Sequence, residues 1–179
     1  MTFSRMYILF LVLLPTLGLK GGTGQADEVY LEPENFLAEV FGSPLPEPGV
    51  LWITKDRKAV TSRIMAHSKG PRRIRYWVDG SRSAWVLDEI GKVKPITTGF
   101  VIDNGQIERV AILIYRESRG WEVRYPFFTD QFIGAVVDGD YRLDRSIDGI
   151  SGATLSVDAL TRLSRLALYL AKEINTESQ

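Results

Sequence analysis

Asn104 and Gly105 separate two long apolar runs, residues 96–102 and 107–115. Asn-Gly readily adopts the positive φ angles of a two-residue hairpin turn, so we expect the two runs to form adjacent antiparallel strands. Apolar side chains occupy both alternating sets of positions in the second run, namely Val110, Ile112 and Ile114 and, between them, Ala111 and Leu113. This pattern is typical of a central strand that is covered on both faces.

Two runs upstream predict a second hairpin. Residues 72–78 begin by alternating basic and apolar side chains, Asp79-Gly80 is a turn signal, and residues 83–87 are again apolar. The basic side chains of the first run are Arg72, Arg73 and Arg75. We interpret them as the solvated face of an edge strand, with a patch for phosphate or a partner as the alternative.

The last part of the chain carries the clearest helical pattern. Apolar residues recur at intervals of three and four, at Leu160, Leu163, Ala167, Leu170 and Ile174. Ser156 is the predicted N-cap of this helix, and Asp158 is placed in its first turn, where it complements the helix dipole. Shorter segments predict a helix over residues 33–41, a strand over 50–53, a helix within 55–67 and a short helix around 127–133.

Residues 1–26 are typical of a signal peptide. Arg5 supplies a positive charge, residues 7–19 are largely apolar, and Gly24-Gln25-Ala26 supplies small residues for cleavage. The apolar run is shorter than the ~20 residues that span a bilayer. An uncleaved N-terminal anchor is the alternative, so we expect an extracytoplasmic (periplasmic) protein that is either released or membrane-associated.

Composition excludes several kinds of site. The chain has no cysteine, which excludes disulfides, cysteine-ligated iron–sulfur clusters and Cys-x-x-Cys-His haem attachment. His67 is the only histidine, so a zinc site built from several histidines is excluded. The basic and acidic residues number 22 each, and we expect no nucleic-acid partner. Any redox chemistry would therefore use an organic cofactor.

A polar loop directly precedes the last predicted helix. Residues 148–156 read Asp-Gly-Ile-Ser-Gly-Ala-Thr-Leu-Ser and combine two glycines with three hydroxyl side chains. Glycine allows other groups to approach the main chain closely. The start of a helix offers unpaired N–H groups and a partial positive charge, which suit a phosphate. The loop therefore predicts an anion site, and the alternative is a simple turn that ends in a serine N-cap.

The same residues carry a resemblance. Asp-x-x-Ser-Gly-Ala-Thr-x-Ser resembles the flavinylation motif of the FMN-binding domain in the electron-transport subunits of Rnf and Na+-translocating NADH:quinone reductase complexes. In that family a separate flavin transferase, which uses FAD and a divalent metal and releases AMP, attaches FMN through its phosphate to the last threonine of Ser-Gly-Ala-Thr. The resemblance implies covalent FMN on Thr154. The other candidate contacts in the loop are Asp148, Ser151, Gly152, Ala153 and Ser156.

A second segment resembles the family less closely. The family has a His-x-Glu-Thr-Pro-Gly-like turn near the flavin, and Glu117, Ser118 and Gly120 keep part of it. Tyr115 stands at the histidine position and Arg119 at the proline position. Trp121 and Tyr125 follow, and an aromatic side chain here either stacks on the flavin ring or belongs to the core.

The resemblance covers residues from about 85 to 170 and implies an α/β (α+β) fold, with a twisted, mostly antiparallel sheet and helices packed on it. We expect residues 71–179 to form an FMN-binding domain and residues 27–70 a helical extension. The leading hypothesis is an exported electron carrier that exchanges electrons with membrane electron-transport components. The alternatives are a small flavin-dependent reductase and a flavin-free accessory protein.

Overall fold

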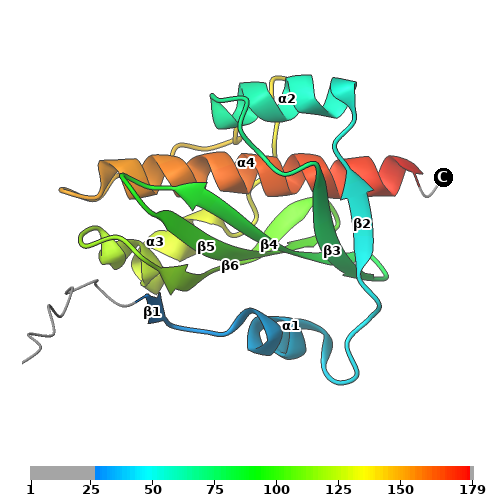
Figure 1. Ribbon diagram of the computed structural model, residues 1–179, viewed down its shortest axis with the longest axis horizontal. Coiled ribbons are helices and arrows are strands. Elements are labelled where there is room, and N and C mark those ends of the chain that lie inside the picture. Colours follow the sequence, from blue (N-terminus) through cyan, green and yellow to red (C-terminus); the bar gives the residue numbers. More distant parts are fainter. Residues whose placement is uncertain (1–26, 178–179) are drawn as a thin grey trace, which may run out of the picture.

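One antiparallel sheet with helices on both faces organises the protein. The computed structural model describes residues 27–177. The strand order is β1-β6-β5-β4-β3-β2, with α4 and α2 on one face and α1 on the other (Figure 1). The strands are β1 (Glu28–Val29), β2 (Gly49–Trp52), β3 (Arg73–Asp79), β4 (Arg82–Ile90), β5 (Pro95–Asp103) and β6 (Gln106–Tyr115). The helices are α1 (Pro33–Phe41), α2 (Lys55–Met65), η1 (Trp121–Arg124), α3 (Pro126–Thr129), η2 (Asp130–Phe132) and α4 (Thr154–Glu177).

The predicted fold class is confirmed. Both predicted hairpins form, because β3 pairs with β4 and β5 pairs with β6, all antiparallel. The helix predicted over residues 33–41 is α1, and the helix predicted within residues 55–67 is α2. Residues 27–70 also supply β1 and β2, the two edge strands of the sheet.

The interpretation of β3 as an edge strand is wrong. β2 pairs with β3 over residues 73–76, so β3 is enclosed between β2 and β4. Its arginines are nevertheless exposed, and the guanidinium groups of Arg73 and Arg75 lie about 6 Å from the rings of Trp52 and Trp77. β2 is separated from β3 by α2, and local sequence patterns do not report such a non-local pairing.

A core lies on each face of the sheet. The predicted apolar stripe of α4 is confirmed, because all five side chains from Leu160 to Ile174 are at most 4 % exposed and pack against the sheet. Each such side chain contributes on the order of 1–3 kcal/mol when it leaves water. On the other face Phe36 of α1 packs against Gly99, where a Cβ would lie only 2.7 Å from the phenylalanine ring. The small residue therefore makes room for α1.

A bulge in β6 sets the direction of its last side chains. The register shifts so that Thr97 pairs with Ile114 and Thr98 with Ile112, which leaves Leu113 as an extra residue. Its carbonyl accepts hydrogen bonds from the N–H groups of Tyr30 and Leu31 at 2.8 and 3.2 Å. The prediction that Ile114 shares a face with Val110 and Ile112 is therefore wrong, because Ile114 packs on the α1 side.

The same bulge turns Tyr115 toward the α4 side, where it joins the main core. Bulges re-aim side chains in this way, often next to functional sites. Among residues 27–177, no helix has both the length and the apolar composition needed to cross a bilayer. The signal peptide or anchor predicted for residues 1–26 lies outside the described residues.

Candidate functional site

A cleft opens at the end of the sheet where α4 begins. It has a volume of about 590 Å³, which is within the usual range for small-molecule sites. Three segments form it: the turn between β4 and β5, the loop that follows β6, and the start of α4. Its lining residues are Lys92, Glu117, Ser118, Arg119, Gly152, Ala153, Thr154, Leu155 and Ser156. The fold thus brings together the two sequence segments on which the family resemblance rests.

Thr154 is the first residue of α4 and lines the cleft. Its side chain is exposed, and its hydroxyl makes no hydrogen bond to the residues that the structure describes. Gly152, two residues earlier, has a φ of +81°, which a residue with a Cβ adopts only at a cost. This glycine lets the loop turn sharply into the helix, so that the threonine hydroxyl is presented at the surface.

The first turn of α4 offers free hydrogen-bond donors. The N–H of Val157 bonds to the carbonyl of Ala153 at 3.0 Å, and the N–H of Ala153 bonds to Ile150 at 3.0 Å. The backbone N–H groups of residues 154–156 have no partner within residues 27–177. Together with the dipole of a 24-residue helix, these three donors form a local environment suited to an anion.

Two predictions about this helix are wrong. Ser156 is the third residue of α4 and not its N-cap, so Asp158 lies beyond the first turn. The Ser156 side chain is buried, and its hydroxyl oxygen lies 3.0 Å from that of Tyr115. The sequence pattern placed the helix start three residues too late because Ser156 has the residue type of an N-cap.

Glu117 fixes the turn that forms the opposite wall of the cleft. Its Oε1 accepts hydrogen bonds from the backbone N–H groups of Lys92, Val93 and Lys94 at 2.5, 2.5 and 2.8 Å. Burial disfavours the ionised carboxylate, but the three backbone donors outweigh this effect and lower the pKa of Glu117 below its ordinary value. The carboxylate therefore stays charged and holds the turn between β4 and β5 against the loop after β6.

A buried hydroxyl pair joins that loop to α4. The Tyr115 hydroxyl donates a hydrogen bond to the carbonyl of Arg119 at 2.6 Å and also contacts the hydroxyl of Ser156. Gly120 follows with a φ of +85°, and a Cβ there would lie 2.9 Å from the Ser156 hydroxyl oxygen. The two loops approach so closely only because residue 120 has no side chain. Burial raises the pKa of Tyr115, which keeps its phenol protonated.

The remaining predicted residues do not line the cleft. Asp148 is exposed, and its backbone N–H donates to the side chain of Gln131 at 2.7 Å. Ser151 is exposed in the loop before α4. Trp121 begins η1, just beyond the cleft residue Arg119, and its ring packs edge-on against Tyr125 with centroids 5.7 Å apart. Lys92 lines the cleft but could not be predicted to do so, because it lies in a short turn with no motif of its own.

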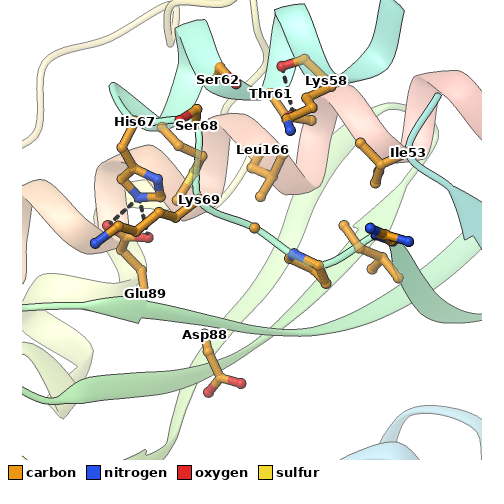
Figure 2. A pocket seen from close by; sticks show the side chains of 15 residues that line it. Ile53, Lys58, Thr61, Ser62, His67, Ser68, Lys69, Asp88, Glu89 and Leu166 are labelled. Atoms are coloured by element: carbon orange, nitrogen blue, oxygen red, sulfur yellow. Dashed lines mark hydrogen bonds and ion pairs between the residues drawn. The ribbon is translucent and has the colours of Figure 1, made fainter. Parts of the chain in front are cut away.

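A second, smaller cavity lies between α2, β4 and α4 (Figure 2). It has a volume of about 120 Å³ and includes His67 and Glu89. The buried Glu89 carboxylate lies 3.1 Å from His67 Nε2 and 3.1 Å from a guanidinium nitrogen of Arg162. This network attaches the end of α2 to β4 and α4, which is a structural role. Residues 27–177 contain no cluster of three histidine or acidic side chains arranged to bind a metal.

The comparison with protein families agrees with the position of the larger cleft. Residues 91–169 match the family model of the FMN-binding domain. The chain contains an FMN-binding domain. The matched residues of this FMN-binding domain begin next to Lys92, include Glu117 and the whole 148–156 loop, and end within α4. This match supports an FMN-binding protein. A comparison with curated proteins found none that matches the sequence.

The cleft has the chemistry that FMN requires. FMN carries a phosphate, and the unpaired N–H groups at the start of α4 are suitable donors for it. The Lys92 side chain lines the same cleft and adds positive charge. The cleft therefore suits FMN because of these hydrogen-bond donors and because of its volume. Thr154 is the exposed hydroxyl next to the donors.

Proposed function

We propose that this FMN-binding domain carries its FMN covalently, through a phosphoester bond to the hydroxyl of Thr154. The observation that supports the proposal is the position of this hydroxyl. It is exposed, has no hydrogen-bond partner among the described residues, and belongs to the helical turn whose N–H groups can receive a phosphate. The motif Asp-x-x-Ser-Gly-Ala-Thr-x-Ser places the same threonine at the attachment position of the family it resembles.

The chain is proposed to be the substrate of this attachment and not its catalyst. A threonine hydroxyl is a weak nucleophile unless a base or a metal activates it. The acidic side chain that lines the cleft is Glu117, and its Oε1 already accepts three backbone hydrogen bonds. We therefore infer that a separate flavin transferase, with FAD and a divalent metal, supplies the activation.

In the proposed transfer, the FMN half of FAD passes to the hydroxyl oxygen of Thr154. The O–H bond of Thr154 breaks, and its oxygen forms a bond to the FMN-side phosphorus of FAD. The pyrophosphate P–O bond to AMP breaks, and AMP leaves with that electron pair. The threonine proton passes to a base of the transferase. No electron is transferred in this step, so the protein gains one FMN and loses the elements of one water.

The role of the loaded protein is proposed to be electron transfer. FMN supplies the redox chemistry when it is bound, and the protein positions it and sets its electrostatic surroundings. The free N–H groups of residues 154–156 would hold the phosphate. Lys92 and the turn fixed by Glu117 would border the opposite side of the cleft. We propose that residues 1–26 direct export, and that the carrier exchanges electrons with membrane electron-transport components outside the cytoplasm.

Co-expression with an active flavin transferase tests this proposal. Flavin that remains on the denatured polypeptide is detected by its fluorescence in a denaturing gel. Thr154→Ala is expected to abolish this fluorescence, whereas the control variant Ser146→Ala, at an exposed serine just before the motif, is expected to retain it. Covalent flavin on Thr154→Ala would contradict the assignment of Thr154. Saturable turnover of a small acceptor by the isolated reduced protein would favour the reductase hypothesis.

A further inference from the structure

Four apolar or aromatic side chains form an exposed patch beside the cleft. Val29, Trp121, Tyr125 and Phe127 are 46, 40, 38 and 62 % exposed. Trp121 and Tyr125 have ring centroids 5.7 Å apart, and Tyr125 and Phe127 have centroids 6.2 Å apart. Val29 lines the same surface hollow as Trp121. The four residues are therefore contiguous, and we call them the aromatic patch.

A cation lies within the aromatic patch. The guanidinium carbon of Arg124 is 5.1 Å from the Trp121 ring centroid and 5.0 Å from that of Tyr125. It is also 4.3 Å from the ring centroid of the partly buried Tyr30, which lines the same surface hollow. Arg124 donates a hydrogen bond to the Tyr125 hydroxyl at 3.2 Å. Aromatic rings with a polar edge, combined with arginine, are typical of protein surfaces that lie at the boundary between water and lipid.

The aromatic patch is close to two other features. Trp121 follows the cleft residue Arg119 by only two positions, so the patch borders the cleft. Val29 belongs to β1, which is the first element of the described structure (Figure 1). The 26 residues that precede the described structure contain the apolar run of residues 7–19. They join the fold at Asp27, two residues before Val29.

We propose that the aromatic patch rests on the surface of a lipid bilayer, with its side chains at the level of the headgroups. When residues 1–26 are retained as the N-terminal anchor, their apolar run and the aromatic patch contact the same membrane, because a short stretch of chain connects them. This contact would hold the FMN cleft close to the bilayer surface. On this proposal, the aromatic patch binds the membrane surface and not a soluble protein partner. The inference does not depend on covalent FMN.

The absence of cysteine permits a direct test with single labelling sites. The full chain, with residues 1–26 retained, is made flavin-free by cell-free synthesis as the variant Phe127→Cys and labelled with a fluorophore. The matched control is Val50→Cys, which is 43 % exposed in β2, the opposite edge strand of the sheet. Both proteins are reconstituted in phosphatidylcholine vesicles that carry a nitroxide on a lipid acyl chain.

The proposal predicts that the nitroxide lipid quenches the label at residue 127 and that iodide in the aqueous phase quenches the label at residue 50. A residue-127 label that is quenched by iodide and not by the lipid would overturn the proposal. The same result, quenching by iodide and not by the lipid, is expected if the patch binds a protein partner instead of the membrane.

A second variant tests whether the aromatic side chains themselves make the contact. Trp121→Ser in the labelled Phe127→Cys protein is expected to reduce quenching by the lipid roughly twofold or more, because the affinity of such a surface for lipid scales with its buried apolar area. The matched change is Val78→Ser, which is 39 % exposed in β3 and lies outside the patch. It is expected to leave quenching unchanged. Equal quenching in both variants would contradict a role for the aromatic patch.

Discussion

The hydroxyl of Tyr115 lies 3.0 Å from the hydroxyl of Ser156, although 41 positions separate the two residues. Tyr115 donates its single proton to the carbonyl of Arg119, so Ser156 is the donor in the bond between the two hydroxyls. This pair joins the last residue of β6 to the first turn of α4. It therefore fixes the distance between the loop of residues 117–120 and the loop that carries Thr154.

Tyr115→Phe is expected to loosen this connection. The change leaves the Ser156 hydroxyl and the Arg119 carbonyl without their partner, which costs about 1–3 kcal/mol of stability for a buried polar group. Urea unfolding of Tyr115→Phe, Ser156→Ala and the double variant measures the coupling. The two effects should be non-additive, because both changes remove one shared hydrogen bond. Strictly additive effects would show that the hydroxyl pair contributes no stability.

Gly120→Ala is expected to destabilise the cleft through two separate effects. The φ of +85° is unfavourable for alanine, and the new Cβ would also lie 2.9 Å from the Ser156 hydroxyl oxygen. Gly80→Ala is a matched control, because residue 80 has a φ of +59° and nothing within 4 Å of a built Cβ. Thermal unfolding should therefore show a larger loss for Gly120→Ala than for Gly80→Ala. Equal losses of thermal stability in the two variants would mean that a Cβ at residue 120 does not clash with the Ser156 hydroxyl.

Glu117 should make the stability of the protein depend on pH in the acidic range. Its pKa in the folded protein lies below the ordinary value of 4.5, so the folded state favours the ionised form. This contribution is fully present above the unfolded-state pKa and is lost as the pH falls through the folded-state pKa. Hydrogen bonds to a charged group contribute about 1.5–3 kcal/mol.

Glu117→Gln should therefore lower the unfolding free energy at pH 7 and reduce its decline on acidification. Chemical denaturation between neutral and acidic pH measures both quantities. Glu122→Gln is a suitable control, because Glu122 lies a few residues further along and does not line the cleft. An unchanged pH profile in Glu117→Gln would contradict the role assigned to this carboxylate.

Glu89→Ala should affect the fold but not the cleft. The Glu89 carboxylate contacts both His67 and Arg162, and Figure 2 shows its contact with His67. The change removes this shared partner from both side chains. Both partners are partly exposed, so we expect a loss of about 1–3 kcal/mol. FMN content for each folded molecule should be unchanged, and this is measured by absorbance after purification. A selective loss of FMN at unchanged stability would show that this network serves the cofactor site.

Several elements could be predicted from the sequence because local patterns determine them. The hairpin at Asn104-Gly105 follows from its turn residues, and α4 follows from its apolar stripe. The bulge at Leu113 could not be predicted, because a two-residue period assigns Ile114 and Tyr115 to the wrong faces. The position of β3 inside the sheet depends on its pairing with β2, which no local signal encodes.

The candidate site was predictable in part for the same reason. The loop before α4 contains glycines and hydroxyl residues at adjacent positions, so its suitability for an anion could be inferred from the sequence. Glu117, in contrast, bonds to backbone N–H groups of residues 92–94, and backbone donors leave no signal in the residue types. The turn that contains Lys92, which Glu117 holds in place through these hydrogen bonds, was therefore found only in the structure.

The mass of the intact protein tests the central proposal most directly. The protein is co-expressed with a periplasmic flavin transferase of demonstrated activity on a control substrate, and its peptides are then mapped. The proposal predicts a gain of one FMN minus one water, located on the peptide that contains Thr154. An unmodified mass, or the same gain on a peptide without Thr154, would contradict it.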